Sequence, residues 1–286
     1  MLVVLFGVSG MLGSAIEKVF NAAGYTVIGY NSSSCDITDK AQVNRVFEVH
    51  KNIDLVINCA AYTKVDDAEE NFEKATLINA TAVEYLARIS KRSNALFVHF
   101  STDYVFDGNS YEPYKETDLT NPVNLYGKSK YDGEINCIKN CDNYYIFRVQ
   151  WLYAVNGNNF VKTMQHLFKH KQELNVVNDQ LGTPTFTGSL ANYVLNVVQH
   201  RPEPGIYHCT DKGSGSWFDL CKEIALYEGY KGLINPVSSN EFKRPANRPL
   251  NGVLNCTKLD NTLSIDRLHW KESLALYYKL IKEENI

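Results

Sequence analysis

The residues best suited to chemistry are a tyrosine and a lysine four positions apart, Tyr126 and Lys130. On a helix, side chains at positions i and i+4 lie on one face. A lysine ammonium beside a phenol lowers the pKa of the phenol towards neutrality, so the tyrosine can act as general acid or base at a carbonyl or carbinol oxygen. Many helices carry such a pair as a solvated surface pair, so its meaning depends on the rest of the chain.

A hydroxyl that suits the same chemistry lies upstream, in the segment Ser101 to Gly108 at the end of a predicted strand. Thr102 can donate a second hydrogen bond to the oxygen on which Tyr126 acts. The alternative is a strand-end threonine that only caps a turn. With a glycine-rich turn before it and Tyr126 and Lys130 after it, Thr102 completes a predicted catalytic set.

The chain begins with a glycine-rich turn typical of dinucleotide binding. Gly7, Gly10 and Gly13 follow the first apolar run and open a predicted helix. Glycines there let the backbone approach a pyrophosphate, and the free amides of the helix N-terminus attract the anion. The turn therefore predicts a nicotinamide dinucleotide cofactor.

The residues after the second predicted strand bear on which dinucleotide binds. The segment Tyr30 to Ser34, which includes Asn31, has no acidic residue to receive the ribose hydroxyls and no Arg or Lys to bind a 2′-phosphate. Because no carboxylate repels a 2′-phosphate and Asn and Ser can donate to one, the loop favours NADP(H) over NAD(H). Asp36 and Ile37 are a candidate contact to the adenine, and capping of the next helix is the alternative for Asp36.

The elements that must position these residues alternate between short apolar runs and amphipathic stretches. This alternation predicts a Rossmann-type α/β fold, with a doubly wound parallel sheet covered on both faces. The predicted strands are Leu2 to Phe6, Thr26 to Tyr30, Leu55 to Cys59, Leu96 to Ser101 and Tyr144 to Val149, and the predicted helices between them are 11–23, 39–51, 72–92 and 123–139. Ligands are expected at the carboxyl ends of the strands.

After about residue 150 the pattern is looser, with helices predicted near 157–170, 186–200, 216–229 and 270–283 and six prolines in the loops between them. We expect a nucleotide-binding domain over 1–150, to which the helix near 186–200 returns. A smaller C-terminal α/β substrate domain is expected over 151–185 and 201–286. The substrate then lies in the cleft between the two.

The composition excludes several classes of function. Lys and Arg number 29 against 32 Asp and Glu, with no block of like charge, so neither nucleic acid nor an anionic membrane surface is an expected partner. No stretch reaches the roughly 18 apolar residues of a membrane span. Met1 to Phe6 lacks a basic flank and reads as a strand, not a signal peptide, so a cytoplasmic location is expected.

Together, these residues resemble the dTDP-4-dehydrorhamnose reductase family of extended short-chain dehydrogenases. The resemblance covers nearly the whole chain and is specific in several places besides the glycine turn. The matching segments are Val56 to Asp66, Ser101 to Phe106, Tyr126 to Lys130, Arg148 to Tyr153, Asn178 to Thr185 and Arg248-Pro249.

The resemblance implies NAD(P)H-dependent reduction of the C4 keto group of dTDP-4-dehydro-L-rhamnose, with the proton from Tyr126. The catalytic residues are then Thr102, Tyr126 and Lys130. Cofactor contacts are implied for Gly7, Gly10, Met11, Leu12, Asn31, Asp36, Ile37, Ala60, Ala61, Tyr62, Thr63, Tyr126 and Lys130. Substrate contacts are implied for Thr102, Asp103, Val105, Tyr126, Trp151 and Arg248, where Trp151 is alternatively a packing residue and Arg248 a solvated loop arginine.

The sequence departs from the family pattern in two places. Gln150 stands where the family usually has a small residue before the tryptophan, which affects the shape of the expected sugar pocket. Some members bind magnesium at a dimer interface through acidic residues, and the corresponding positions here are Ser14-Ala15 and Thr187 to Ser189. We therefore predict no metal site, and either a monomer or a homodimer formed in another way.

Other activities of related proteins remain as alternatives. A 4,6-dehydratase needs an Asp-Glu pair after the threonine, and a 3,5-epimerising reductase often has a cysteine two positions after it, but Tyr104 occupies that place. A UDP-linked 4-keto-6-deoxy sugar is an alternative substrate. A non-catalytic reading is also open, since the regulatory subunit of methionine adenosyltransferase resembles the same reductases and binds NADP without an established need for turnover.

Overall fold

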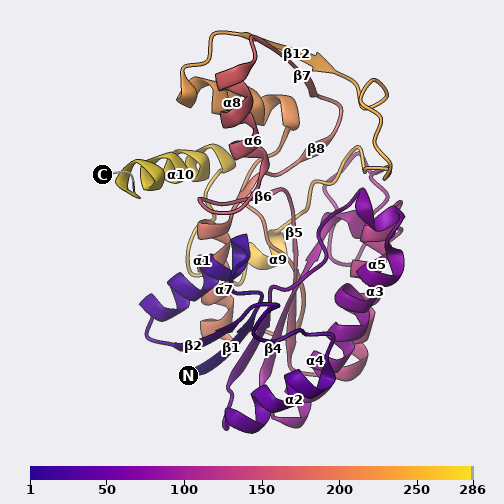
Figure 1. Cartoon of the computed structure of the whole chain (residues 1–286), viewed down its shortest axis with the longest axis vertical. Coiled ribbons are helices and arrows are strands. Elements are labelled where there is room, and N and C mark those ends of the chain that lie inside the picture. The colour runs from indigo at the N-terminus through magenta and orange to yellow at the C-terminus, as the bar shows by residue number, and fades with distance from the viewer. Residues whose placement is uncertain (285–286) are drawn as a thin grey trace.

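The computed structural model, which describes residues 1–284, has a six-stranded parallel sheet at its centre (Figure 1). Its strands are β1 (Leu2–Phe6), β2 (Thr26–Tyr30), β3 (Leu55–Asn58), β4 (Leu96–Thr102), β5 (Tyr144–Val149) and β10 (Gly205–His208), in the order β10-β5-β4-β3-β1-β2. The five strands predicted from the sequence are confirmed, and β10 is an addition at one edge.

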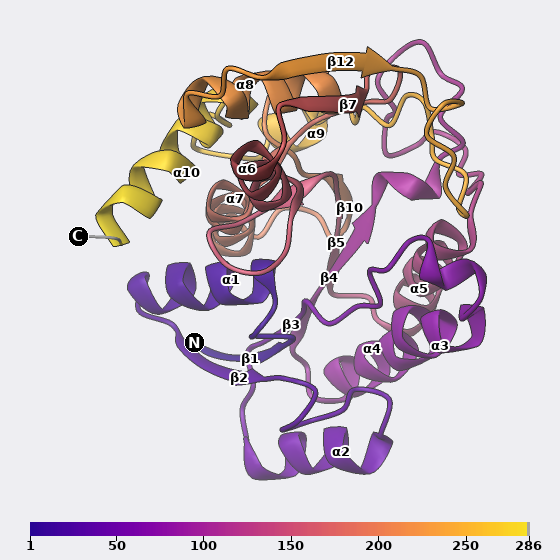
Figure 2. The same ribbon diagram turned by 45° about the horizontal axis from the view of Figure 1, so that its top comes forward.

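Helices cover both faces of the sheet, so both faces of its strands are buried (Figure 2). On one face, α1 (Met11–Ala22) packs against α7 (Thr187–His200), the helix predicted near 186–200. The other face is covered by α2 (Lys40–Val49), α4 (Ala82–Arg92) and α5 (Leu125–Asn140). Burial on both sides explains why the strands read as continuous apolar runs in the sequence.

The helix predicted over 72–92 is divided into three parts. They are α3 (Phe72–Thr76), a π-helical turn η2 (Leu77–Thr81) and α4. The backbone of Asn79 in this turn lies so close to α5 that a Cβ on Gly133 would come within 2.1 Å of the Asn79 carbonyl oxygen. The predicted helical span is confirmed, and the π-helical turn within it was not foreseen, because periodicity does not reveal a wide turn that tertiary contacts hold open.

The C-terminal part lies beyond the carboxyl ends of the strands, at the top of Figure 1. It contains α6 (Phe160–His170), α8 (Trp217–Glu228) and α10 (Trp270–Glu284), whereas the short helix α9 (Thr257–Asp260) packs against β10 of the central sheet. Three two-stranded sheets join these helices, pairing β7 (Glu173–Val177) with β12 (Leu233–Val237), β8 (Leu181–Gly182) with β11 (Gly215–Ser216), and β6 (Leu152–Tyr153) with β9 (Thr185–Phe186).

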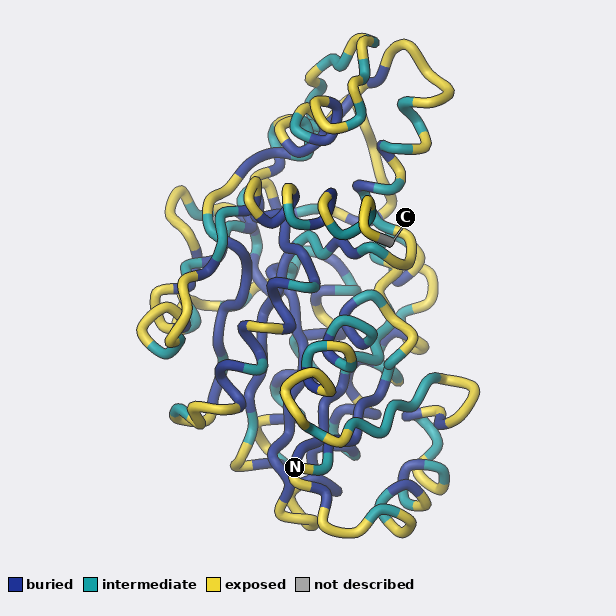
Figure 3. Tube along the Cα trace, turned by 90° about the vertical axis from the view of Figure 1, so that its left-hand side faces the viewer, coloured by how far each residue is buried: buried dark blue, intermediate teal, exposed yellow. Residues whose placement is uncertain are grey.

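Burial is greatest along the strands of the central sheet and least in the loops at the periphery (Figure 3). The seven cysteines are free thiols, and only Cys59 among them is not fully buried. No helix within residues 1–284 is long and apolar enough to cross a membrane. In the same residues, no cluster of three or more His, Cys, Asp or Glu side chains is arranged to hold a metal ion.

Candidate functional site

The glycine-rich turn joins β1 to α1 where the order of the strands reverses, between β1 and β3. Gly7 has a φ of +81°, and a Cβ on it would lie 2.6 Å from the backbone nitrogen of Ala60. A Cβ on Gly13 would lie 2.1 Å from the Gly7 carbonyl oxygen. The turn therefore tolerates no side chain at these two positions, as a close approach of helix, strand and ligand requires.

The N-terminus of α1 is free of side-chain caps. Gly10 caps the helix without a side-chain hydrogen bond, and the first turn, which starts with Met11 and Leu12, carries no acidic residue. The backbone N–H groups of this turn thus keep their capacity for an anion, which the helix dipole also favours.

The loop after β2 is folded by its own side chains. The Asn31 Oδ1 accepts hydrogen bonds from the backbone nitrogens of Ser33 (2.9 Å) and Ser34 (3.1 Å). Asp36 accepts from the backbone nitrogen and hydroxyl of Thr38, while Asp39 caps α2. The alternative that Asp36 caps this helix is therefore wrong. Ile37 is 6% exposed and packs in the core.

The loop after β3 is bound to the start of α5 through a buried asparagine. Asn79, fully buried, accepts from the Tyr62 backbone nitrogen (2.8 Å) and donates to the Tyr62 carbonyl (3.0 Å) and the Ser129 hydroxyl (2.9 Å). Ser129 in turn donates to the Tyr126 carbonyl at 2.7 Å. Ala60, Ala61 and Tyr62 are partly buried and Thr63 is exposed. This bridge was not predicted, because Asn79 belongs to no motif.

The first turn of α5 is held against the end of β4. The Asn124 side chain accepts from the Gly127 backbone nitrogen at 2.7 Å, which caps the helix. A Cβ on Gly127 would lie 2.1 Å from the Tyr104 carbonyl oxygen, so the helix approaches the turn η3 (Asp103–Val105) without an intervening side chain. The ring of Tyr126 consequently meets that of Tyr104 edge to face at 5.8 Å.

The three predicted catalytic residues meet at the carboxyl end of β4, and with Asp103 we call them the sheet-end site. Thr102, the last residue of the strand, lies near enough to Tyr126 for its hydroxyl to act to lower the pKa of the phenol. Lys130, one helical turn beyond Tyr126, is 3% exposed and donates from Nζ to the Phe100 carbonyl at 2.6 Å.

The protonation equilibria of this site differ from the sequence-based expectation. Burial, followed by the Asp103 carboxylate, raises the pKa of Tyr126 above its ordinary value, against a lowering by the Thr102 hydrogen bond. Burial also lowers the pKa of Lys130 to about 8. The lowered phenol pKa expected beside Lys130 is not found, because the loss of water around Tyr126 and the Asp103 carboxylate both raise it.

Asp103 is the other ionisable group of the sheet-end site and is 3% exposed. Its Oδ1 accepts from the Thr102 hydroxyl (3.0 Å) and its Oδ2 from the Gln150 Nε2 (2.8 Å). Burial raises the pKa of Asp103 to about 7, although both hydrogen bonds act to lower it. Val105, in contrast, is fully buried in the hydrophobic core, so its side chain presents no surface to a ligand.

Trp151 follows β5 in a left-handed conformation, with a φ of +45°, which is uncommon for a bulky residue. Its indole stacks on that of Trp217 with 3.7 Å between ring centroids, and a Cβ on Gly182 would lie 2.7 Å from it. Trp151 therefore stacks on Trp217, a residue that lines a cavity, and its contact with the sugar stays a prediction.

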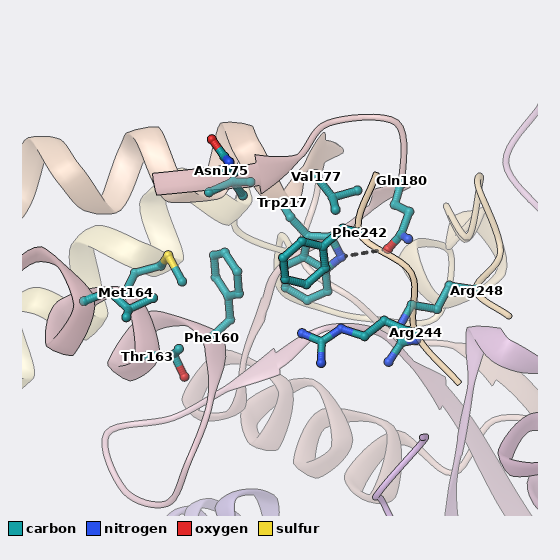
Figure 4. Close-up of a pocket in the computed structure, with 12 residues that line it drawn as sticks. Phe160, Thr163, Met164, Asn175, Val177, Gln180, Trp217, Phe242, Arg244 and Arg248 are labelled. Atoms are coloured by element: carbon teal, nitrogen blue, oxygen red, sulfur yellow. Dashed lines mark hydrogen bonds between the residues drawn. The ribbon is translucent and has the colours of Figure 1, made fainter. Parts of the chain in front are cut away.

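This cavity, of about 320 Å³, lies in the C-terminal part and is shown in Figure 4. Its walls are mainly apolar, with the rings of Phe160, Trp217 and Phe242 among aliphatic side chains, and two guanidinium groups lie side by side at one end. We call it the aromatic cavity, and its main residues are Phe160, Gln180, Trp217, Phe242, Arg244 and Arg248. Trp217 donates from Nε1 to the Gln180 side-chain oxygen at 3.2 Å, and Arg244 lies over the Phe242 ring at 4.8 Å.

Of these residues only Arg248 was predicted as a contact. Phe160 and Trp217 are the first residues of α6 and α8. An aromatic residue at the start of each of these helices was the signal in the sequence that could have pointed to the cavity. Arg248 donates to both oxygens of Asp66, at 3.0 and 2.9 Å, and to the Ala246 carbonyl. It is thus an anchored side chain, and the alternative of a solvated loop arginine was wrong.

Comparisons with known proteins agree with this geometry. Residues 1–283 match the family described as RmlD substrate binding domain. The chain belongs to this family. The match confirms the resemblance inferred from the motifs. A solved dTDP-4-dehydrorhamnose reductase is similar to this chain over almost the same residues that match the RmlD family.

Individual RmlD-type relatives are similar over almost their whole length. The spore coat polysaccharide biosynthesis protein SpsK of Bacillus subtilis is 38% identical over 275 residues, 96% of each chain. A dTDP-4-dehydrorhamnose reductase structure from Clostridium acetobutylicum is 42% identical with a TM-score of 0.95, covering 99% of this chain and 100% of that one. The enzyme from Bacillus anthracis, in complex with NADP, is 36% identical with a TM-score of 0.94, covering 97% and 98%.

Proposed function

We propose that the protein reduces the C4 keto group of dTDP-4-dehydro-L-rhamnose to give dTDP-L-rhamnose, with NADP(H) as cofactor. The observation that carries the proposal is the convergence of Thr102, Tyr126 and the buried Lys130 ammonium at the carboxyl end of β4. Relatives of similar length and high structural likeness are dTDP-4-dehydrorhamnose reductases, which supports this substrate.

The residues of the first domain fit a dinucleotide. The bare turn at Gly7, Gly10 and Gly13 and the uncapped start of α1 at Met11 and Leu12 suit a pyrophosphate. Asn31, Asp36 and Ile37 would lie at the adenosine, and Ala60 to Thr63 along the nicotinamide half. When bound, the reduced cofactor supplies the hydride. The absence of a carboxylate after β2 and the NADP complex of the Bacillus anthracis relative support NADP(H).

The protein's own groups supply the proton. The raised pKa of Tyr126 keeps its phenol protonated at neutral pH, so it can donate to the C4 oxygen as charge develops there. Thr102 lies beside the phenol and aligns it. The Lys130 ammonium, whose pKa is about 8, stabilises the phenolate that remains after the transfer.

The aromatic cavity suits the nucleotide part of the substrate. Its apolar walls can stack on a base, and Arg244 and Arg248 together match the charge of a diphosphate. Because Arg248 is already bound to Asp66, Arg244 is the guanidinium that is freer to approach the phosphates. Trp151, stacked on Trp217, and Asp103, bound to Thr102, then flank the sugar between the cavity and Tyr126.

The test is the loss of NADPH absorbance with purified protein and dTDP-4-dehydro-L-rhamnose generated in situ. We expect turnover, and a Tyr126→Phe variant should lose about 10²–10⁴-fold in kcat/KM because it lacks the proton donor. Parallel assays with NADH and with the UDP-linked sugar show which cofactor and which nucleotide of the substrate give the higher kcat/KM. NADPH binding without any turnover would contradict the reductase and favour a non-catalytic, NADP-binding regulatory protein.

A further inference from the structure

Gln150 is the residue at which the sequence departs from the family pattern, and it lies directly after β5. It is 2% exposed, and both ends of its amide are used. Nε2 donates to the Asp103 Oδ2 at 2.8 Å, while Oε1 accepts from the Thr183 backbone nitrogen at 2.7 Å. The amide therefore ties the sheet-end site to the segment between β8 and β9.

The space around the amide is closed by two glycines. A Cβ on Gly252 would lie 2.5 Å from both the Asp103 Oδ2 and the Gln150 Nε2, and one on Gly182 would lie 2.8 Å from the same nitrogen. Real side chains essentially never approach so closely, so the backbone at both glycines packs directly on the amide. The contact between Gln150 and Asp103 is thus enclosed by neighbouring segments.

The effect of this contact reaches the proposed proton donor through one more residue. Asp103 accepts from Gln150 on one oxygen and from the Thr102 hydroxyl on the other, at 3.0 Å. Thr102 also accepts from the Tyr104 backbone nitrogen at 3.2 Å, and its hydroxyl acts on the pKa of Tyr126. The orientation of the Thr102 hydroxyl consequently depends on where the carboxylate is held.

We propose that Gln150 is a positioning residue for the reduction, whose amide holds the Asp103 carboxylate in place so that Asp103 orients the Thr102 hydroxyl beside Tyr126. The proposal rests on the proposed reductase function.

Electrostatics give the proposal a measurable signature. The titratable groups that face Asp103 are the phenols of Tyr104 from η3 and Tyr126 from α5, with Arg248 and Asp66 acting on Tyr104 from beyond. Asp103 has a raised pKa of about 7, and the Gln150 hydrogen bond lowers it. Without the amide, the carboxyl should stay protonated to higher pH and donate where it now accepts.

The experiment follows the Asp103 carboxyl by NMR in protein with ¹³C-labelled aspartate, the signal being assigned by its loss in Asp103→Asn. In Gln150→Leu we expect the midpoint of the Asp103 titration to rise by about one pH unit or more, since a donor to a charged group is lost. The acid limb of the kcat/KM profile should move in the same direction, with kcat/KM at neutral pH about 10-fold lower and the NADPH dissociation constant unchanged.

Two further variants separate positioning from structure. Gln150→Glu keeps the shape but places a second carboxyl beside Asp103, so the pair should share one proton and activity should rise as the pH falls. The Gln150→Glu variant tests the proposal even if Gln150→Leu fails to fold. Gln165→Leu, which removes a partly buried amide from α6, is the matched control and should leave the Asp103 titration unchanged.

The outcomes distinguish this proposal from the proposed function. An unchanged Asp103 titration and pH profile in both Gln150 variants, with an active wild-type protein, would overturn the role of Gln150 and leave the reductase intact. A wild-type protein that binds NADPH but turns over neither sugar would overturn the reductase, and with it any role of Gln150 in that reaction.

Discussion

The sheet-end site and the aromatic cavity differ in how their side chains are held. In the sheet-end site Asp103 and Lys130 are each 3% exposed, and Lys130 has a backbone carbonyl as its partner. In the aromatic cavity the rings of Phe160 and Trp217 meet at a tilt, and Phe242 remains 45% exposed. A desolvated site can tune proton transfer, whereas an open aromatic surface can only bind. Substitutions in the first should thus affect the rate of chemistry, and those in the second affinity.

The largest effect is expected at the sheet-end site. Lys130→Met should lower kcat/KM by about 10²–10³-fold, because the charge that stabilises the Tyr126 phenolate is lost. A lysine is charged below its pKa, so the wild-type activity should fall as the pH rises through about 8, and this limb should be absent from the variant. The measurement is kcat/KM between pH 6 and pH 10, roughly the range that frames this pKa.

The matched control for that change is Lys128→Met on the same helix. Lys128 is exposed and pairs with Asp132 at 3.4 Å, so its loss should leave activity within about twofold. If the two variants behave alike, or if Lys130→Met keeps the alkaline limb, the sheet-end site does not control proton transfer.

A smaller effect of a different kind is expected in the cavity. Trp217→Ala removes the stacking surface next to Phe160 and Trp151, so the KM for the nucleotide sugar should rise about 10-fold while kcat stays within about twofold. Steady-state kinetics at saturating NADPH measure both. Tyr227→Ala, which removes a half-exposed stacked ring outside the cavity, is the control. A fall in kcat at unchanged KM would contradict a binding role for the cavity.

The smallest effect is expected where the two regions are joined, at the ion pair of Asp66 and Arg248. Its side chains are 31% and 19% exposed, so the pair should contribute about 1 kcal/mol, and Asp66→Asn should raise the KM about fivefold. Asp266→Asn, which changes a fully exposed carboxylate that pairs with Lys212, should change nothing. A lower KM in Asp66→Asn would instead show that Asp66 competes with the substrate diphosphate for Arg248.

The elements of the first half were predictable because each is specified locally. Runs such as Leu96 to Ser101 are continuous and apolar, which suits a strand buried on both faces, and the helices between them show helical periodicity. The strand β10 was missed, since its four residues form a strand only by pairing with β5. The wide turn at Asn79 was missed for a similar reason, as its hydrogen bonds run to Tyr62 and Ser129 far along the chain.

The amino-acid sequence by itself determined the fold class and the glycine turn, and it predicted Thr102, Tyr126 and Lys130 as a catalytic set, because the patterns involved are local to a strand, a turn or a helix. Only the tertiary structure decided that Phe160, Trp217, Phe242 and Arg244 line one cavity, and that Gln150 binds Asp103. It also reversed the expected shift in the pKa of Tyr126. Contacts between distant segments and the loss of water on burial arise only when the chain is folded, so no local pattern encodes them.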